Sequence, residues 1–345
     1  VDFSLSTTDV KSLPSFPGNN GIGSAGNAMS HAMQLTATNT ANYKLNLDYV
    51  HDFNFMLGQE GVNFRSESFQ VVTRGQNNDY LTNLSTGTMA TSWANTYSSY
   101  SYLSFFGRGE YNYMDKYLFE ANGRYDGSSK FPKDDRFGFF PSFSAGWTIS
   151  NEPFFKDNVS RDVVSFLKLR ASWGRNGNVS VLNNYAYATS INYGGSWYQF
   201  DVDDPAQSLG AKPSGLANPD LKWETSDQVD VGIDAHFLNS KLVVTADYFH
   251  KTTNDLLVNV SPSASIGVSS TTINAGSVIN SGLEFEVTWK DQVGDFAYSV
   301  SANASTLKNK VTYLDPTISR ITGTVPQGSN LSTTFQQGYP IWYFR

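Results

Sequence analysis

Residues 117–126, with the sequence YLFEANGRYD, alternate between two kinds of side chain. Tyr117, Phe119 and Tyr125 stand on one side of the alternation, and polar residues such as Glu120 and Arg124 stand on the other. Successive side chains of a β-strand point to opposite faces, so the stretch predicts a strand with one apolar and one largely polar face. Its length matches the ~9–11 residues with which a tilted strand crosses a bilayer.

The same alternation recurs in about a dozen segments along the chain, and many of these segments have a similar length. Clear further examples are residues 41–49, 167–174, 229–237, 283–290 and 296–305. No stretch of useful length shows helical periodicity. The pattern therefore predicts an all-β fold.

The connections between these segments fall into two kinds. Short turns are expected near residues 50–52, 114–116, 194–196, 239–241 and 292–295, and long loops at 67–96, 127–136, 205–222 and 254–280. If the chain runs up and down, all the short turns lie at one end of the sheet and all the long loops at the other. The connection formed by residues 151–164 is longer, but it lies at the same end as the short turns. Bacterial outer-membrane barrels show this asymmetry, so the pattern favours a transmembrane antiparallel β-barrel.

Alternation alone leaves a soluble β-sandwich open, because a sandwich also buries one face and exposes the other. Three features favour a barrel. Short and long loops are sorted to opposite ends, and the charges fall mainly on the face opposite the apolar residues. Aromatic residues also occur near the segment ends, as in the interfacial girdles of barrels. The aromatic positions are Tyr111, Tyr113, Tyr117, Trp173 and Trp289.

The composition of the 345 residues excludes several classes of protein. Charged residues make up 16%, well below the ~25% of soluble domains, and aromatic residues make up 14%. No apolar run reaches the ~18 residues of a transmembrane helix, and the aromatic content argues against disorder. A net charge of −7 gives no support to nucleic-acid binding, and the absence of cysteine excludes disulfides and thiol sites.

Motifs for catalysis or metal binding are weak. Residues 21–26 (GIGSAG) match the G-x-G-x-x-G pattern, but they follow a proline-containing loop and no βαβ unit surrounds them, which indicates a flexible loop. The histidines show no H-E-x-x-H spacing. Asp201, Asp203 and Asp204 could bind calcium, but the glycine and glutamate of an EF-hand loop are missing, which favours a solvated acidic loop. No catalytic residue, cofactor or metal site is expected.

The polar face remains as the candidate site, because it would line the lumen of a large barrel. The lumen-facing candidates are Arg108, Glu110, Glu120, Asn122, Arg124, Asp230, Asp234, His236, Glu284 and Glu286. Three aromatic residues of the predicted loops could stack on sugar rings or peptides, or could equally be girdle or loop-packing residues. These loop candidates are Trp197, Tyr198 and Trp223.

A series of motifs resembles the SusC/RagA family of TonB-dependent outer-membrane transporters, and the order and spacing of the motifs match that family. The stretches are 117–131, 137–147 (FGFFPSFSAGW), 167–178 (LKLRASWGRNGN), 218–224 (NPDLKWE), 247–256 and 280–286 (NSGLEFE). Phe137 departs from the family, which often has tryptophan there. The resemblance extends from about residue 39 to the end.

The resemblance implies a 22-stranded barrel, of which this chain would supply about half. Residues 1–345 are then expected to form part of one barrel domain, without a plug domain or a TonB box. The family implies import of large nutrients, oligosaccharides or peptides, with a SusD-like surface lipoprotein as a lid and energy supplied through TonB. The implied location is the outer membrane of a Gram-negative, Bacteroidetes-like bacterium.

Two alternatives from other classes stay open at this point. One is a soluble all-β module that binds glycans, and the other is an outer-membrane barrel enzyme. Neither has a motif of its own in the sequence, since no G-x-S-x-G accompanies His236 and the aromatic loop residues have more than one explanation.

Overall fold

The computed structural model describes residues 2–13, 22–198, 208–260, 264–268, 271–323 and 331–345. These residues are mainly strands, with one short helix, α1 (Pro153–Asn158), and three turns of 3-10 helix. None of the helices in the described ranges is long and apolar enough to cross a membrane.

The strands are β1 (Asp2–Ser12), β2 (Gly23–Leu47), β3 (His51–Gln76), β4 (Met89–Tyr113), β5 (Tyr117–Ser128), β6 (Phe137–Thr148), β7 (Val164–Asn178), β8 (Ile191–Tyr198), β9 (Ser208–Pro213), β10 (Glu224–Phe237), β11 (Leu242–Val260), β12 (Thr271–Val293), β13 (Phe296–Ser305), β14 (Lys308–Leu314), β15 (Ile321–Thr322), β16 (Thr333–Phe335) and β17 (Tyr343–Phe344).

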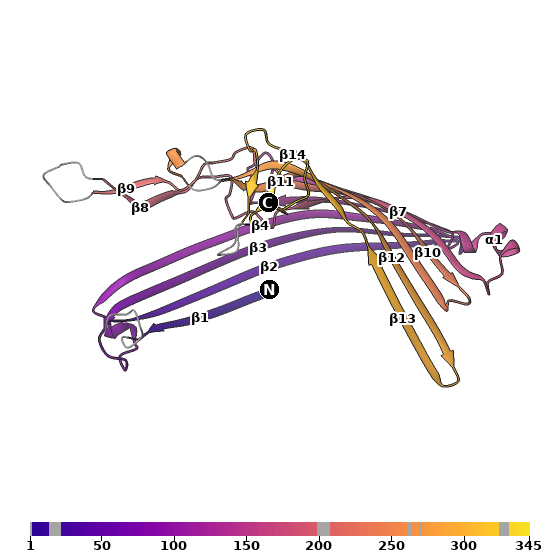
Figure 1. Ribbon diagram of the computed structural model, residues 1–345, viewed down its shortest axis with the longest axis horizontal. Helices are drawn as coiled ribbons and strands as arrows, with labels where there is room; N and C mark the ends of the chain where they lie inside the picture. The colour runs from indigo at the N-terminus through magenta and orange to yellow at the C-terminus, as the bar shows by residue number, and fades with distance from the viewer. Residues whose placement is uncertain (1, 14–21, 199–207, 261–263, 269–270, 324–330) are drawn as a thin grey trace. The chain divides into compact units, whose positions relative to one another are not determined.

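Twelve of these strands form one sheet (Figure 1), in the order β1-β2-β3-β4-β5-β6-β7-β10-β11-β12-β13, with β14 also paired to β12. Strands β8 and β9 form a separate hairpin, and β15, β16 and β17 form a small third sheet. The chain divides into two units: Val1–Asn39 with Glu60–Leu103, and Thr40–Gln59 with Ser104–Arg345. Strands β2, β3 and β4 contribute residues to both units.

In the second unit the predicted alternation is confirmed by the antiparallel register. Tyr117 lies opposite Trp147, and Trp147 lies opposite Leu169, so apolar residues follow one another across β5, β6 and β7. The same face continues across β10 with Ile233 opposite Leu169. Large apolar side chains on this face are exposed, with Phe119 and Val231 each 51% accessible. A face of this kind suits contact with lipid rather than water.

Aromatic rings gather on the apolar face near the short turns. The ring of Tyr117 lies 6.1 Å from that of Tyr113 and 6.5 Å from that of Trp147, and Tyr111 lies 6.4 Å from Phe119. Tyrosine and tryptophan favour membrane interfaces because each ring has an apolar body and a polar tip. Tyr111, Tyr113 and Tyr117 of the predicted girdle therefore lie together at this end, whereas Trp173 stacks on Phe143 at 6.0 Å farther along β7.

Two of the short connections contain a β-turn whose two central residues both have positive φ. These are Asp48 and Tyr49, at 54° and 56°, and Met114 and Asp115, at 52° and 55°. Such turns match the right-handed twist of the strands they join. An asparagine holds the second turn, because Asn112 Oδ1 accepts a hydrogen bond from the Asp115 backbone N–H at 2.9 Å.

The sorting of connections by length is confirmed in the second unit. Residues 48–50, 114–116, 238–241 and 294–295, with the helical segment 149–163, join strands at one end. Residues 129–136 and 261–270 and the long segment from β7 to β10 join them at the other. The turn expected at 194–196 is wrong: these residues lie within β8, where the pairing with β9 shifts register between Tyr193 and Ser196.

The strands extend farther than predicted. Residues 67–96 were expected to be one long loop, but β3 continues to Gln76 and β4 begins at Met89. Strands β11 and β12 likewise reach into residues 254–280. In residues 67–76 and 89–96, polar or small residues interrupt the apolar positions of the odd-numbered face, and residues 256–258 are apolar without alternating, so the period of two is weak, although the backbone pairing continues.

In the first unit, β1 pairs with β2 along its whole length, with Phe3 opposite Met33 and Thr7 opposite Met29. Side chains tie the neighbouring strands: His31 Nε2 lies 3.7 Å from Glu67 Oε2, and the guanidinium of Arg65 lies over the Tyr97 ring at 5.1 Å. The sheet of this unit therefore has one face made by the odd-numbered residues of all four strands.

A hydrophobic core sits at the long-loop end of the second unit. Phe131, Leu182, Leu221 and Leu257 are buried there, and Trp223 packs against them. Three of these residues come from loops and one from β11, so the core joins loops that are far apart in the sequence. A second core, formed by Val278, Val311, Leu314 and Phe335, joins β12 to β14 and to the small sheet of β15 to β17.

Candidate functional site: the polar face of the sheet

The polar face of the second unit collects charged residues from neighbouring strands. The register places Arg170 of β7, Gly232 of β10, Asp247 of β11 and Glu284 of β12 in one row. The next row contains Lys168, Asp234, Thr245 and Glu286. The predicted lumen candidates Asp234, Glu284 and Glu286 therefore share one face with two cations.

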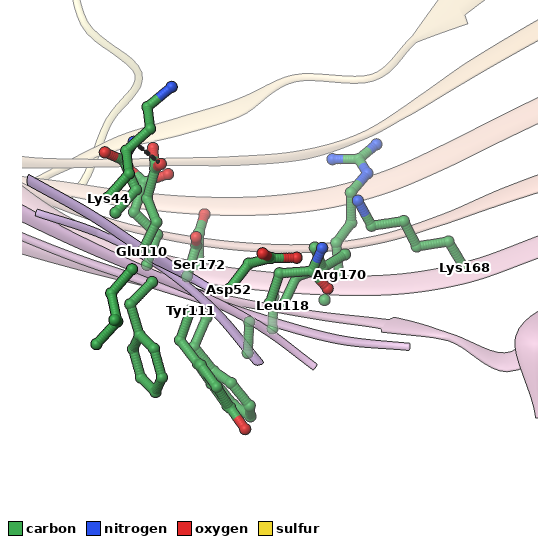
Figure 2. A pocket seen from close by; sticks show the side chains of 18 of the residues that line it. Lys44, Asp52, Glu110, Tyr111, Leu118, Lys168, Arg170 and Ser172 are labelled. Carbon is green, nitrogen blue, oxygen red and sulfur yellow. Dashed lines mark hydrogen bonds between the residues drawn. The ribbon is translucent and has the colours of Figure 1, made fainter. Parts of the chain in front are cut away.

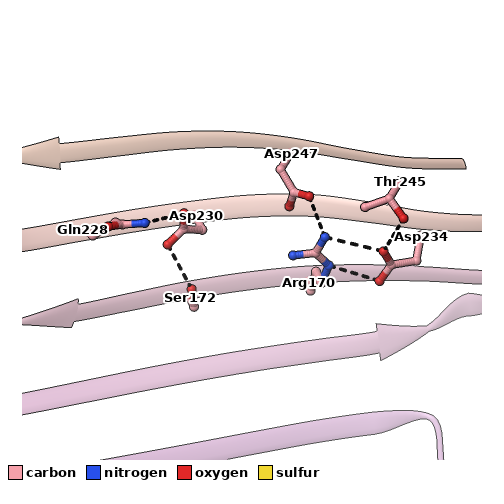
Figure 3. A network of polar contacts seen from close by, with 7 residues as sticks. All are labelled: Arg170, Ser172, Gln228, Asp230, Asp234, Thr245 and Asp247. Atoms are coloured by element: carbon pink, nitrogen blue, oxygen red, sulfur yellow. Dashed lines mark hydrogen bonds and ion pairs between the residues drawn. The ribbon is translucent and has the colours of Figure 1, made fainter. Parts of the chain in front are cut away.

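Arg170 is the centre of this arrangement (Figure 3). Its Nε atom lies 3.0 Å from Asp234 Oδ2, and its Nη2 atom lies 2.7 Å from Asp247 Oδ2. The side chain of Arg170 thus starts on β7 and extends across β10, so that its guanidinium reaches β11. Gly232 makes this crossing possible, since a Cβ atom there would fall against Asp247 and lie 2.8 Å from Arg170 Cζ.

Neighbouring groups extend the network. Thr245 Oγ1 donates to Asp234 Oδ1 at 3.2 Å, while Asp230 accepts from Gln228 Nε2 at 2.9 Å and from Ser172 Oγ at 3.4 Å. Asp230 and Asp234 are therefore each held by a residue of a neighbouring strand, and in addition by a residue of β10 for Asp230 and by Arg170 for Asp234. Charges arranged in this way are fixed in place before any solute arrives.

The candidates on β4 and β5 also form pairs. Arg108 Nε lies 3.1 Å from Glu110 Oε1, and Arg124 Nε lies 2.6 Å from Asp126 Oδ1. Asn122 Nδ2 donates to Glu120 Oε1 at 2.7 Å. Residues two apart on a strand point to the same face, which explains why each pair meets along its own strand.

A hollow of about 720 Å³ lies over this face. Figure 2 shows Lys44, Lys168 and Arg170 on one side of the sheet, while the ring of Tyr111 points to the other side. Fixed charges of both signs line the hollow. They are the carboxylates Asp52, Glu110, Glu120 and Asp230, and the cations Lys44, Lys168 and Arg170. A hollow with this lining suits a polar solute or polypeptide segment that carries both donors and acceptors.

The other candidates lie outside this hollow. His236 packs against the Phe166 ring at 4.9 Å, close to the short turn at 238–241. Glu284 and Glu286 are exposed and face a smaller hollow of about 370 Å³ that Asp247, Asn303 and Ser305 also line. Within the described ranges, no group of three or more histidines, aspartates and glutamates is placed to hold a metal ion.

Of the three loop candidates, the structure describes the side chain of Trp223 alone. Trp223 is partly buried: its ring lies 4.8 Å from Phe131, and its Nε1 donates to the Arg136 carbonyl at 3.2 Å. Trp197 and Tyr198 end strand β8, and their side chains lie outside the described residues. Asp201, Asp203 and Asp204 also lie outside them. Residues 23–26 of the glycine motif belong to β2, so they do not open a helix.

Glu152 and Lys130, which both lie outside the strands, have shifted pKa values. Hydrogen bonds from Tyr117, from Trp147 Nε1 at 3.2 Å and from Lys116 Nζ at 3.2 Å hold the pKa of Glu152 below its usual value, although burial opposes this. Burial lowers the pKa of Lys130, whose Nζ donates to the Leu182 carbonyl at 2.8 Å. Glu152 thereby fastens the segment before α1 to the aromatic girdle.

The sequence missed the residues that organise the site, above all Arg170, Asp247 and Lys44. Arg170 is one of the polar residues in the alternation of residues 167–174, so the sequence alone predicts the face of the strand on which it lies. The sequence does not predict the partners of Arg170, because they depend on the register between three strands.

Comparison with known proteins identifies the family to which this architecture belongs. The family model described as TonB dependent receptor-like, beta-barrel matches residues 2–344. The chain is 32% identical over 309 residues to the TonB-dependent receptor SusC of Bacteroides thetaiotaomicron, a match that covers 89% of this chain and 30% of the relative. It is 31% identical over 305 residues to the TonB-dependent receptor P26 of Formosa agariphila, covering 84% of this chain and 29% of that protein.

Among solved structures, the chain superimposes on one described as the RagAB peptide transporter. The TM-score is 0.84 at 26% identity, and the match covers 98% of this chain and 36% of that one. The chain thus spans about a third or less of the length of the proteins it matches. These relatives are receptors and transporters rather than enzymes. The chain belongs to the family of TonB-dependent receptor-like β-barrels.

Proposed function

We propose that the protein containing this chain imports large polar nutrients, oligosaccharides or peptides, across the outer membrane of a Gram-negative bacterium of the Bacteroidetes type. In this proposal the chain forms part of one barrel domain, a SusD-like surface lipoprotein covers the opening, and TonB supplies the energy. The family membership and the likeness to SusC and to the RagAB peptide transporter support the proposal.

The observation that carries the proposal is the contrast between the two faces of the second unit. One face exposes large apolar side chains such as Phe119, Val231 and Phe285. The other holds the Arg170 network and the hollow of about 720 Å³ with fixed charges of both signs. A barrel wall with lipid outside and a hydrated solute path inside has this distribution.

The test is uptake by intact cells that carry the full-length gene, with and without a protonophore. Labelled oligosaccharides and labelled tryptic peptides serve as the two probes. We expect one probe to accumulate in the periplasm only while the proton gradient is present. Accumulation of both probes without the gradient, or of neither in cells whose outer membrane contains the folded protein, would contradict the proposal.

A second experiment addresses the lumen candidates. Replacement of Asp230 by asparagine removes one charge from the hollow and keeps the side chain's shape, whereas Val231→Leu changes only the apolar face. Uptake of the accepted probe is expected to change in the Asp230→Asn variant and to stay at the parental rate in the Val231→Leu variant. Equal effects of the two changes would remove the hollow from the solute path.

A further inference from the structure

The polar face of the second unit carries a further hollow of about 400 Å³ at its long-loop end. Strands β7, β10, β11 and β12 form one side of this outer hollow, and the segment just before β17 forms the other. The residues that carry the argument are Asn176, Ser226, Lys251, Thr253, Asn280 and Trp342. Lys251 lies four residues beyond Asp247 on the same face of β11, which places it about 13 Å from the Arg170 network along the strand. A solute that arrives from the long-loop end therefore meets the outer hollow before that network.

Trp342 lines the outer hollow in a backbone conformation that bulky residues rarely adopt. Its φ is 51°, in the left-handed region, and such a conformation persists only where surrounding contacts fix it. The Trp342 ring lies 5.8 Å from that of Phe335, and it packs so closely on Gly323 that a Cβ atom there would lie 3.1 Å from Cζ3. Trp342 nevertheless remains 46% accessible. The surrounding contacts therefore hold a large, rigid ring partly open at the hollow.

The segment that leads into β17 is fixed to β14. Val311 accepts a backbone hydrogen bond from Gly338 at 2.8 Å and donates one to the Tyr339 carbonyl at 2.9 Å. The Ile341 N–H donates to Asn309 Oδ1 at 3.0 Å. This side of the hollow is therefore formed before a solute arrives, as is usual for ligand sites.

The positive charge of Lys251 is available to a solute. The register places an uncharged amide side chain opposite it on each neighbouring strand, and among the described residues Lys251 makes no ion pair. The one carboxylate that lines the hollow is already occupied, because Glu224 Oε1 accepts from Asn178 Nδ2 at 2.9 Å and Oε2 accepts from the Leu257 N–H at 3.0 Å. Lysine presents a compact charge, which suits a carboxylate or a sulfate.

The other polar groups of the outer hollow suit sugar hydroxyls. The side-chain amides of Asn176 and Asn280 have no hydrogen-bond partner among the described residues, and each amide can both donate and accept. Ser226 and Thr253 add two hydroxyls, which lie 3.1 Å apart. A sugar hydroxyl also donates and accepts, and the C–H face of a sugar ring packs on the apolar body of an indole.

The sheet is less suited to a peptide. Extended peptides are commonly bound by pairing of their backbone with a free sheet edge. Strand β10 is paired with β7 and β11, β11 with β10 and β12, and β12 with β11 and β14. The sheet therefore presents side chains rather than an open strand edge to the hollow.

We infer that the outer hollow binds an anionic unit of an oligosaccharide, one that carries a carboxylate or a sulfate. Trp342 stacks on the sugar ring, and Lys251 pairs with its anionic group. Asn176 and Asn280 form hydrogen bonds with its hydroxyls. The inference rests on the proposed import function and narrows the solute to acidic oligosaccharides.

The first test is binding to the purified full-length protein, together with any lipoprotein that copurifies with it, by isothermal titration calorimetry. The probes are oligogalacturonate for the carboxylate, carrageenan oligosaccharides for the sulfate, maltohexaose as the neutral sugar and a glutamate-rich peptide. One of the two acidic sugars is expected to bind about tenfold or more tightly than maltohexaose and the peptide, because a charge-assisted hydrogen bond is stronger than a neutral one.

The second test compares variants with the acidic sugar that binds. Lys251→Met is expected to weaken binding about tenfold or more, whereas Lys251→Arg keeps the charge and stays within about threefold of the parent. Lys133→Met is the matched control, because it removes an exposed charge from a loop at the same end of the sheet, outside the hollow. Trp342→Ala is expected to weaken binding, and Trp342→Phe to retain most of it. Heat-modifiable migration on gels shows that each variant contains folded barrel.

Four results would overturn the inference: no binding of either acidic sugar, equally tight binding of maltohexaose or the peptide, equal effects of Lys251→Met and Lys133→Met, or parental affinity in Trp342→Ala. Uptake by intact cells separates these results from failure of the proposed function. Gradient-dependent uptake of maltohexaose or peptides at the parental rate in a Lys251→Met strain would remove the outer hollow alone. Absence of gradient-dependent uptake of every probe would contradict import itself.

Discussion

Arg170 and Asp247 lie on strands that are not adjacent, yet Arg170 Nη2 reaches Asp247 Oδ2 at 2.7 Å because Gly232, on the strand between them, has no side chain in the way. The same guanidinium holds Asp234. One arginine therefore connects three strands of the wall on its polar face, and the connection depends on the absence of a side chain at position 232.

Gly232→Ala is expected to destabilise the protein by about 1–3 kcal/mol, because the new methyl group displaces Arg170 and leaves charged groups of the network poorly paired. The measurement is the free energy of unfolding by urea of the full-length protein in lipid vesicles. Gly109→Ala is the matched control, since a Cβ there would meet only ordinary contacts with Phe55 at 3.6 Å. Equal losses of unfolding free energy in the two variants would show that the Arg170 bridge makes no specific contribution to stability.

The two faces of β5 are expected to respond differently to a new charge. Ala121 is exposed and lies opposite Phe143 on the apolar face, so Ala121→Arg is expected to cost about 2–4 kcal/mol near the bilayer midplane. Asn122→Arg, next to Glu120 on the polar face, is expected to be nearly silent. Unfolding titrations of both variants in lipid measure the difference, and equal costs would reverse the assignment of the faces.

Glu152 gives the stability a dependence on acid pH. Since its pKa is lowered in the folded protein, its contribution is present above the carboxyl pKa of the unfolded chain, about 4.3, and is lost as the pH falls through the lower folded value. The parent is thus expected to be more stable than Glu152→Gln at neutral pH, with a difference that shrinks on acidification. Unfolding free energies of both proteins from pH 7 down to pH 3 test this, and a gap that widens in acid would contradict it.

The loop core is expected to hold the long loops as one body. Phe131 is completely buried, so Phe131→Ala is expected to cost about 3–5 kcal/mol locally and to free the neighbouring loops. Limited proteolysis should then cleave residues 179–190 at least tenfold faster than in the parent. Phe154→Ala, at an exposed position of α1, is the control. Unchanged cleavage in the Phe131→Ala variant would mean that the loops are held by other contacts.

The sequence alone predicted the parts of the fold that depend on contrast between neighbours along one strand. Alternation identified β5, β7, β10 and β13, because each places apolar and polar side chains in turn. It failed at residues 67–76 and 89–96, where polar or small residues interrupt the apolar positions of the odd-numbered face and only backbone pairing reveals the strand. Residues 194–196 read as a turn because of their two glycines, but the structure has them in β8 with a shift of register.

The candidate site was predicted as a face rather than as a set of contacts. Asp230, Asp234 and Glu110 were found because each has the right parity on its own strand. The bridge from Arg170 to Asp247 could not be found, because it requires the register of β7, β10 and β11 together. The packing of Trp223 against Phe131 was hidden for a similar reason, since the two residues come from different loops.

The loop core also limits how relatives of this protein can diversify. Phe131, Leu182 and Leu221 come from separate loops but fill one shared space with Leu257, so a change of length in one loop disturbs the others. Insertions and deletions should therefore be rare in these loops and concentrate in the β8–β9 hairpin, which pairs only with itself among the described strands. Variation between species at the outer surface would then be confined to a few segments by the packing beneath them.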